Sequence, residues 1–188
     1  MAMPHTVRRF TLEEYHRMGE TGVLPADARV ELIDGQVVEM SPIGRDHASC
    51  VIRLTDILAR QAAAHVSISV QNPLILNDLR EYQPDVVALT RRDHRYGAAL
   101  PTAADALLVI EVGDSSVSFD RTTKIPAYAA ALVPEAWLVD LPSDRVEVYR
   151  DPEGGSYQTV AIANRGATVT PLALPQLHAA VSEILGTG

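Results

Sequence analysis

Two acidic residues, Asp85 and Glu111, stand at the edges of apolar segments. Residues 106–112 are continuously apolar except for Glu111, which is the pattern of a central strand covered on both faces. A carboxylate in such a strand is costly to bury unless it is paired or binds a cation. If the two strands are neighbours, Asp85 and Glu111 converge at one end of a sheet. Their oxygen atoms would suit a hard cation, Mg²⁺ or Mn²⁺.

Lys124 follows on a segment of helical character, with Asp120 one turn before it and Tyr128 one turn after it. A lysine beside a bound metal can orient the attacking water or stabilise negative charge on a phosphate in the transition state. Asp85, Glu111 and Lys124 therefore indicate a candidate metal site, although two acids and a lysine occur by chance in many proteins.

Each of these residues also has a structural interpretation. Asp85 could begin a strand after Pro84, and Glu111 could be a buried glutamate in an ion pair with Lys124. Asp120 and Lys124, at positions i and i+4, make an ordinary helix pair worth only about 0.3 kcal/mol, and this is our interpretation of Asp120.

His47 and Cys50 offer weaker support for chemistry. They share one face of an expected helix at i and i+3, as a base and a nucleophile would, but no third group orients the pair. We expect Cys50 to be a small core residue. As the only cysteine it cannot form an internal disulfide, which agrees with a reducing compartment.

The overall charge restricts how the chain could bind nucleic acid. The formal net charge of the 188 residues is −8, whereas phosphate contacts require Lys or Arg. The clearest basic cluster is LTRRDHR at residues 89–95, which we interpret as a solvated loop. No apolar run reaches the length of a membrane helix, and no secretory signal is recognisable. We therefore expect a cytoplasmic protein without a membrane partner.

Hydrophobic periodicity and turn residues predict one mixed-sheet α/β domain over residues 1–188. A capping-box spacing from Thr11 to Glu14 predicts a helix over residues 11–18, and Asp34-Gly35 predicts a hairpin. The further helices are expected at residues 45–65, at 118–132 with an interruption at Pro126, and at 174–185. The further strands are expected within residues 66–76, 82–90, 106–112, 135–140, 144–150 and 156–163, the last three as an antiparallel meander.

Five blocks of sequence, in this order, are far more specific than two acids and a lysine. They are ELIDGQVVEMSP at residues 31–42, QPDVVAL at 83–89, LLVIEVGDSS at 107–116, DRTTKIPAYAAALVPEAWLVDL at 120–141 and VEVYR at 146–150. On these blocks the chain resembles, over nearly its whole length, the Uma2 family of restriction-endonuclease-like proteins. That family belongs to the broad PD-(D/E)XK nuclease superfamily.

The resemblance implies a restriction-endonuclease-like fold, in which helices flank a central mixed β-sheet. It makes Asp85 the aspartate of the PD element and Glu111 the second metal carboxylate. The superfamily's lysine usually stands two residues after that acid, where this chain has Gly113, so the resemblance assigns the lysine role to Lys124. Glu31 matches an additional acidic position that could complete the shell of Mg²⁺ or Mn²⁺.

Two functions are compatible with these features. The first is a Mg²⁺- or Mn²⁺-dependent endonuclease acting on nucleic acid, in particular DNA. The second is a catalytically inactive module with the endonuclease fold that serves binding or assembly. The acidic charge, the displaced lysine and the lack of an obvious DNA-reading element support the second, but the retained set of two acids and a lysine favours the enzyme. A homodimer is expected, because cutting two strands takes two sites.

Overall fold

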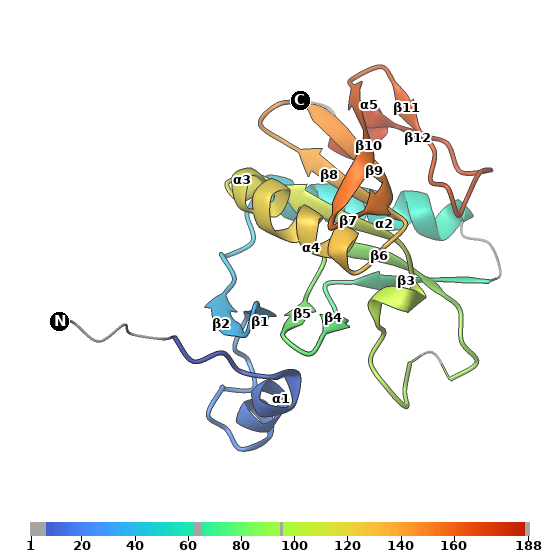
Figure 1. Ribbon diagram of the computed structural model, residues 1–188. Helices are drawn as coiled ribbons and strands as arrows, with labels where there is room; N and C mark the ends of the chain where they lie inside the picture. Colours follow the sequence, from blue (N-terminus) through green and yellow to red (C-terminus); the bar gives the residue numbers. More distant parts are fainter. Residues whose placement is uncertain (1–6, 62–64, 95, 187–188) are drawn as a thin grey trace.

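The computed structural model describes residues 7–61, 65–94 and 96–186. Its centre is a six-stranded sheet in the spatial order β10-β9-β8-β7-β6-β3 (Figure 1). The strands are β3 (Val66–Val70), β6 (Val86–Thr90), β7 (Ala106–Gly113), β8 (Glu135–Asp140), β9 (Arg145–Glu153) and β10 (Ser156–Asn164). Strands β7 and β8 are parallel, and the other neighbouring pairs are antiparallel. The predicted mixed sheet and the predicted meander are therefore confirmed.

β7 is the central strand that the apolar segment predicted. It pairs with β6 on one side and with β8 on the other, and all of its residues except Leu107 are buried. The antiparallel register of β6 and β7 pairs Val86 with Ile110. Asp85, one residue before β6, therefore lies across from Glu111 at the same end of the sheet.

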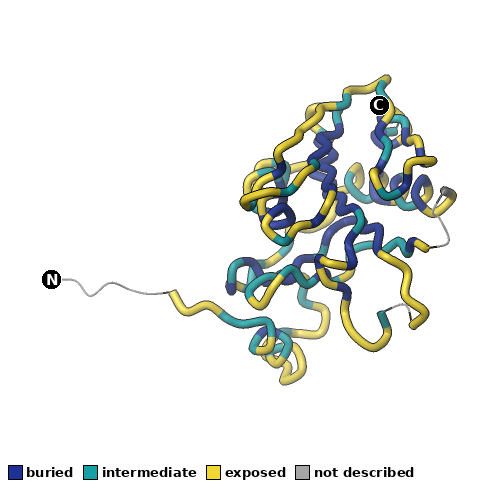
Figure 2. Tube along the Cα trace, turned by 45° about the vertical axis from the view of Figure 1, so that its right-hand side comes forward, coloured by how far each residue is buried: buried dark blue, intermediate teal, exposed yellow. Residues whose placement is uncertain are grey.

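Helices cover both faces of this sheet (Figure 1). On one face, α2 (Arg45–Gln61) and α5 (Val181–Leu185) share a core with Leu108 and with Cys50, which is fully buried as expected. On the other face, α4 (Ile125–Ala130) shares a second core with Val109. Leu108 and Val109 belong to different cores because side chains alternate along a strand. Figure 2 shows the buried segments running through the interior, with exposed segments around them.

A second, four-stranded sheet has the order β2-β1-β5-β4 and lies beside α1 (Leu12–Glu20). Its strands are β1 (Val30–Ile33), β2 (Gln36–Glu39), β4 (Leu74–Asn77) and β5 (Arg80–Tyr82). The predicted hairpin is confirmed, since Asp34 and Gly35 adopt φ values of 50° and 75° between β1 and β2. The predicted capping box of α1 is also present. All four residues of β1 are buried, including Glu31.

The helix expected over residues 118–132 is divided, as Pro126 indicated. α3 (Val117–Phe119) leads into a π-helical turn, Asp120–Lys124, which leads into α4. In a continuous α-helix, Pro126 would have no N–H to donate to the carbonyl four residues earlier. In the wider turn the amide of Ile125 donates to the carbonyl of Asp120, five residues earlier. Such turns are rare and often occur at functional sites.

The prediction of a helix over residues 174–185 is wrong for the first half of that segment. Only Val181–Leu185 is helical, while Ala179–Ala180 forms β12, which pairs with β11 (Thr168–Val169). Pro175 has no N–H to donate to a helical hydrogen bond. Leu174 and Leu177 instead belong to a turn, and their side chains pack in the core. The long helix is confirmed as α2 from Arg45 to Gln61, beyond which residues 62–64 lie outside the described residues. No helix within the described residues is long and apolar enough to cross a membrane.

Candidate active site

The structure brings the four sequence-predicted site residues to one cavity of about 490 Å³. Glu31 comes from β1, Asp85 from the residue before β6, Glu111 from β7 and Lys124 from the π-helical turn. The first turn of α2 adds His47 to the lining. Residues that are far apart in sequence thus meet where the two sheets, α2 and the π-helical turn adjoin.

Three donors orient the carboxylate of Asp85. Oδ2 accepts hydrogen bonds from the backbone N–H of Val112 at 2.8 Å and pairs with Nε2 of His47 at 3.0 Å. Oδ1 accepts from the side-chain amide of Gln71 at 3.2 Å. Gln71 itself has a φ of 51°, and its backbone N–H donates to the carbonyls of Pro84 and Asp85. This left-handed conformation is unusual for a residue with a side chain, and it occurs here next to a candidate site.

Glu111 is 3% exposed, and the same carboxylate oxygen, Oε1, contacts both Tyr128 and Lys124. Oε1 accepts a hydrogen bond from the hydroxyl of Tyr128 at 2.5 Å and lies 3.4 Å from Nζ of Lys124. Burial raises the pKa of Glu111 well above its ordinary value. Lys124 opposes this shift, while the carboxylates of Asp85 and Asp120 increase it.

Lys124 is the buried cation of the cavity, whereas Arg29, which also lines it, is exposed. Its Nζ donates to Oε1 of Glu31 at 3.0 Å and lies 5.9 Å from the centre of the Tyr82 ring. Burial lowers the pKa of this ammonium, but the neighbouring carboxylates of Glu111 and Glu31 outweigh burial and raise it above its ordinary value. Oε1 of Glu31 also accepts from the backbone N–H of Gln83 at 2.6 Å. Glu31 therefore connects the lysine to the segment that precedes Asp85.

Asp120 is buried in the candidate site, so it is more than the ordinary helix pair that its spacing with Lys124 suggested. It lines the cavity, is 4% exposed, and accepts a hydrogen bond from the hydroxyl of Ser116 at 2.6 Å. Burial raises its pKa, although Ser116 and Lys124 oppose the shift. The change from α- to π-helical geometry alters which side chains share a face, and the i, i+4 rule does not foresee this.

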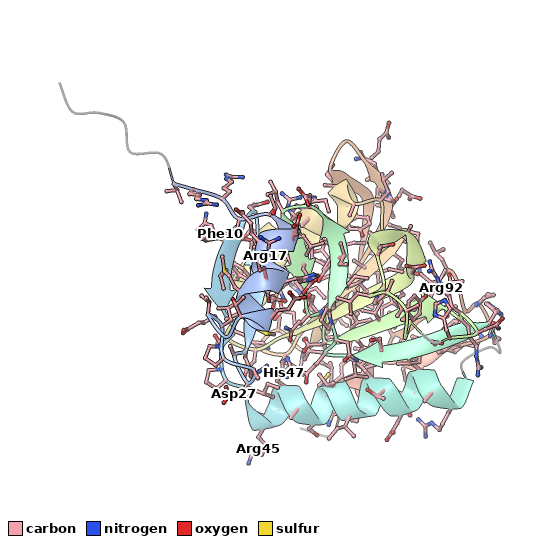
Figure 3. The ribbon with its side chains drawn as sticks, turned by 90° about the horizontal axis from the view of Figure 1, so that it is seen from below. Phe10, Arg17, Asp27, Arg45, His47 and Arg92 are labelled. Atoms are coloured by element: carbon pink, nitrogen blue, oxygen red, sulfur yellow. The ribbon has the colours of Figure 1, made fainter. Side chains whose placement is uncertain are left out.

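Sequence reasoning also missed His47 and Gln71 as partners of Asp85. His47 lies at the start of α2, between that helix and the N-terminal elements (Figure 3). Its hydrogen bond with Asp85 raises its pKa, and its Nδ1 is buried without a hydrogen-bond partner among the described residues. No local pattern links residue 47 to residue 85. A signal did exist for Lys124, which is the only lysine of the chain.

The basic cluster at residues 89–95 lies away from the cavity. It begins at the end of β6 opposite to Asp85, and Figure 3 shows Arg92 well separated from His47. Arg92 pairs with Asp105, and its guanidinium lies 5.2 Å from the centre of the Tyr96 ring. Residue 95 is outside the described residues. The contacts of Arg92 agree with its interpretation as part of a loop.

The chemistry of the donor set fits a hard divalent cation. The cavity gathers several carboxylates around one lysine and one histidine: Glu31, Asp85, Glu111 and Asp120. Their repulsion contributes to the raised pKa of Glu111, and a cation would relieve it. Within the described residues, no three or more His, Cys, Asp or Glu side chains form a ready metal-binding group. Mg²⁺ usually takes only one or two protein carboxylates, with waters and substrate phosphates as its other ligands.

Comparisons with known proteins first define the class of the fold. The chain resembles the crystal structure of a "putative nuclease" from Anabaena variabilis, with a TM-score of 0.75 and 17% sequence identity. The similarity covers 94% of this chain and 97% of that chain. The shared architecture is a central mixed sheet flanked by helices.

The family is then shown by sequence. Residues 12–182 match the Uma2 family, described as "Putative restriction endonuclease". The chain belongs to the Uma2 family, as its five sequence blocks predicted. No curated protein matches the chain significantly. Family and fold together support a nuclease of the restriction-endonuclease-like class.

Proposed function

We propose that the protein is a Mg²⁺- or Mn²⁺-dependent endonuclease that hydrolyses phosphodiester bonds of DNA. One observation carries this proposal. The ammonium of Lys124 lies 3.0 Å from Glu31 and 3.4 Å from Glu111, in a cavity that Asp85 also lines. Three acids and a lysine thus share one accessible space, an arrangement suited to metal-dependent phosphodiester hydrolysis.

Asp85 and Glu111 are the residues that would hold the metal. When bound, Mg²⁺ or Mn²⁺ would polarise the scissile phosphate and lower the pKa of a bound water. The three donors on Asp85 and the hydroxyl of Tyr128 on Glu111 keep both carboxylates in defined orientations. Such outer contacts tune ligands in metal sites.

Lys124 is the proposed catalytic cation. An ammonium has three protons to donate, and Glu31 accepts one of them, while Glu111 lies 3.4 Å away as an ion-pair partner. A remaining proton is available for the attacking water or for an oxygen of the phosphate, where negative charge develops. The high pKa of Lys124 keeps it charged for this role.

Glu31 remains a candidate for the metal shell. Its Oε1 accepts from Lys124 and from the N–H of Gln83, and these contacts support a role in orienting the lysine. Its other carboxylate oxygen could reach a metal on the same wall of the cavity. Glu31→Gln separates the two roles, because the amide oxygen still accepts from Lys124 but binds a cation poorly.

The alternative is a catalytically inactive module. The Lys124–Glu111 contact is also what a structural ion pair would make, and the net charge of −8 disfavours non-specific binding to DNA. Under either function we propose a cytoplasmic homodimer. The buried single cysteine agrees with a reducing compartment.

Cleavage assays test the proposal. Purified protein is incubated with supercoiled plasmid, linear duplex, single-stranded DNA or RNA, each with Mg²⁺, Mn²⁺ or EDTA. We expect metal-dependent cleavage of DNA that is lost in Glu111→Gln and in Lys124→Met. Glu147→Gln changes a buried glutamate outside the cavity, so it serves as the matched control and should keep the activity.

The thermal response to metal provides a second readout. A ligand that binds only the folded state raises the melting temperature by mass action. We expect Mn²⁺ to raise it in the wild type but not in Glu111→Gln. A wild type that neither cleaves any of the four substrates nor responds to Mn²⁺ would leave the inactive module as the better description.

A further inference from the structure

β10 is the open edge of the six-stranded sheet. It pairs with β9 on one side, and in the part of the chain that the structure describes no strand pairs with its other side (Figure 1). Its residues 156–163 also take part in none of the described backbone hydrogen bonds outside the β9 ladder. Every second residue along this edge therefore presents free N–H and C=O groups to a further strand.

The sequence of β10 lacks the features that usually protect an edge. SYQTVAIAN has nine residues, no charge and no proline, and only Tyr157 is buried. Val160 and Ile162 are 54% and 57% exposed, on the same face of the strand. Natural edge strands are usually short, charged, bulged or covered. The opposite edge, β3, has five residues with partly or fully buried side chains.

One further exposed leucine lies near the strand. Tyr157 of β10 donates a hydrogen bond to the carbonyl of Val133, next to Leu132, which is 68% exposed. Apolar surface is therefore present beside an edge whose backbone can still form hydrogen bonds.

We propose that β10 is the dimer interface of the protein, where two copies pair their β10 strands antiparallel into one sheet that continues across both protomers. An antiparallel pair of identical edges obeys a two-fold axis, so each strand satisfies the other. The distribution of charge favours a second copy of the chain as the partner of β10. Each chain carries −8, but β10 has no charge, so two copies can meet there without repulsion between charged side chains. Nucleic acid is a poor occupant, because the strand has no cation for phosphate.

This interface gives the homodimer of the proposed function a location, but it does not depend on catalysis. Glu111→Gln is expected to dimerise as the wild type does. A protein that dimerises through β10 without cleaving DNA would refute the proposed function alone. A nuclease that is monomeric would refute the interface alone.

Sedimentation velocity at micromolar concentrations tests the interface with single substitutions. We expect the wild type to be a dimer and Ile162→Lys and Val160→Lys to be monomers. Ile52→Lys is the matched control, since Ile52 is 62% exposed on α2, and it should remain dimeric. A monomeric wild type, a dimer that survives both lysine substitutions in β10, or a monomeric Ile52→Lys would each overturn the proposal.

Hydrogen exchange locates the contact independently. In the wild-type dimer, amides of β10 should exchange more slowly than in Ile162→Lys, because pairing protects N–H groups that are otherwise open to water. Equal exchange of β10 amides in the two proteins would place any dimer contact elsewhere and overturn the assignment. Circular dichroism and melting curves verify that each lysine variant is folded, as the exposure of these positions leads us to expect.

Discussion

Two groups of buried carboxylates adjoin the π-helical turn, and their charges are balanced to different degrees. The cavity group sets Glu31, Asp85, Glu111 and Asp120 against Lys124 and His47. In the second group, here called the arginine network, Asp140 and Glu147 face Arg121 and Arg145. Arg121 belongs to the same π-helical turn as Lys124, so one short segment serves both groups.

The arginine network is compensated. Glu147 accepts hydrogen bonds from Nε and Nη2 of Arg121, from Arg145 and from the hydroxyl of Tyr149, at distances of 2.5 to 3.0 Å. Burial alone would raise the pKa of Glu147, but these donors hold it below its ordinary value. The ionised network therefore stabilises the folded chain at neutral pH.

The cavity group is not compensated. Burial and neighbouring carboxylates hold the pKa of Glu111 well above its ordinary value despite Lys124. The acids of both groups have little exposed surface, but the side chains of Arg121 and Arg145 are 34% and 30% exposed, whereas that of Lys124 is 7% exposed. Deeper burial and fewer cationic donors therefore both contribute to the raised pKa of Glu111. A site that keeps excess negative charge loses stability unless a ligand supplies the missing charge, which is typical of functional sites.

The largest expected effect is that of Lys124→Met on cleavage. Removing a donor aimed at developing charge commonly lowers kcat by about 10²–10³. Arg121→Met, in the same turn, should reduce stability but leave kcat of the folded protein near the wild-type value. Single-turnover rates and melting curves of both variants test this. Equal rates in Lys124→Met and Arg121→Met would remove the functional distinction between the two groups.

The same substitution should have opposite effects in the two groups. Glu147→Gln removes a charge that accepts several donors, and hydrogen bonds to charged groups contribute about 1.5–3 kcal/mol each. We expect its melting temperature to fall by several degrees without metal. Glu111→Gln removes repulsion and keeps an acceptor for Tyr128, so it should be as stable as the wild type or more so.

This pair of variants also tests the structural interpretation of Glu111. Lys124 keeps its contact with Glu31 in Glu111→Gln, and this limits the cost of losing one partner. Urea unfolding in the presence of EDTA gives both free energies. A Glu111→Gln protein as strongly destabilised as Glu147→Gln would identify Glu111 as part of a structural ion pair.

His47→Ala should weaken metal binding, because Asp85 loses the hydrogen bond from His47 that helps to orient its carboxylate. Loss of an outer-shell partner typically reduces metal affinity or activity by about 10–100-fold. His47→Gln, which retains a donor, should recover part of the loss. His178→Ala is the control, because His178 contacts Thr170 and does not line the cavity. Calorimetric titration with Mn²⁺ measures the affinities, and an unchanged affinity in His47→Ala would contradict this role.

The smallest expected effect is a dependence of metal-free stability on pH. The folded pKa values of Glu111 and Asp120 lie above their ordinary 4.5 and 3.8, so stability falls as pH rises through the folded values. His47 acts in the same direction, since its pKa is raised above 6.5 and its contribution is lost as pH rises through the folded value.

The melting temperature in EDTA should therefore decrease as pH rises above the ordinary pKa values of these carboxyl groups, from about pH 5 upward. In Glu111→Gln the decrease should be smaller, because one of the three groups is gone. Saturating Mn²⁺ should also flatten the curve by replacing protons with a metal charge. A curve that rises over this range would show that the compensated acids dominate the pH response.

Much of the architecture followed from local sequence. Alternating and continuous apolar segments indicated the strands, Asp34-Gly35 indicated the hairpin, and Thr11 with Glu14 indicated the start of α1. Each depends on interactions within a few residues, which sequence spacing describes directly. Pro126 likewise marked where the helix changes its geometry, since its missing N–H is a local property. By contrast, apolar periodicity extended the last helix through Pro175, although core contacts hold that segment as a turn and β12.

The acidic residues and Lys124 were also identified from sequence. The signals were the position of Glu111 in an apolar segment and the resemblance to the family. Sequence alone did not reveal that His47 and Gln71 hold Asp85, or that Asp120 is buried beside Lys124. These contacts depend on how α2, β3 and the π-helical turn pack around the end of β7, and no spacing along the chain encodes that packing. Local chemistry thus determined which residues could react, whereas tertiary packing decided which carboxylates are buried with too few cations to balance them.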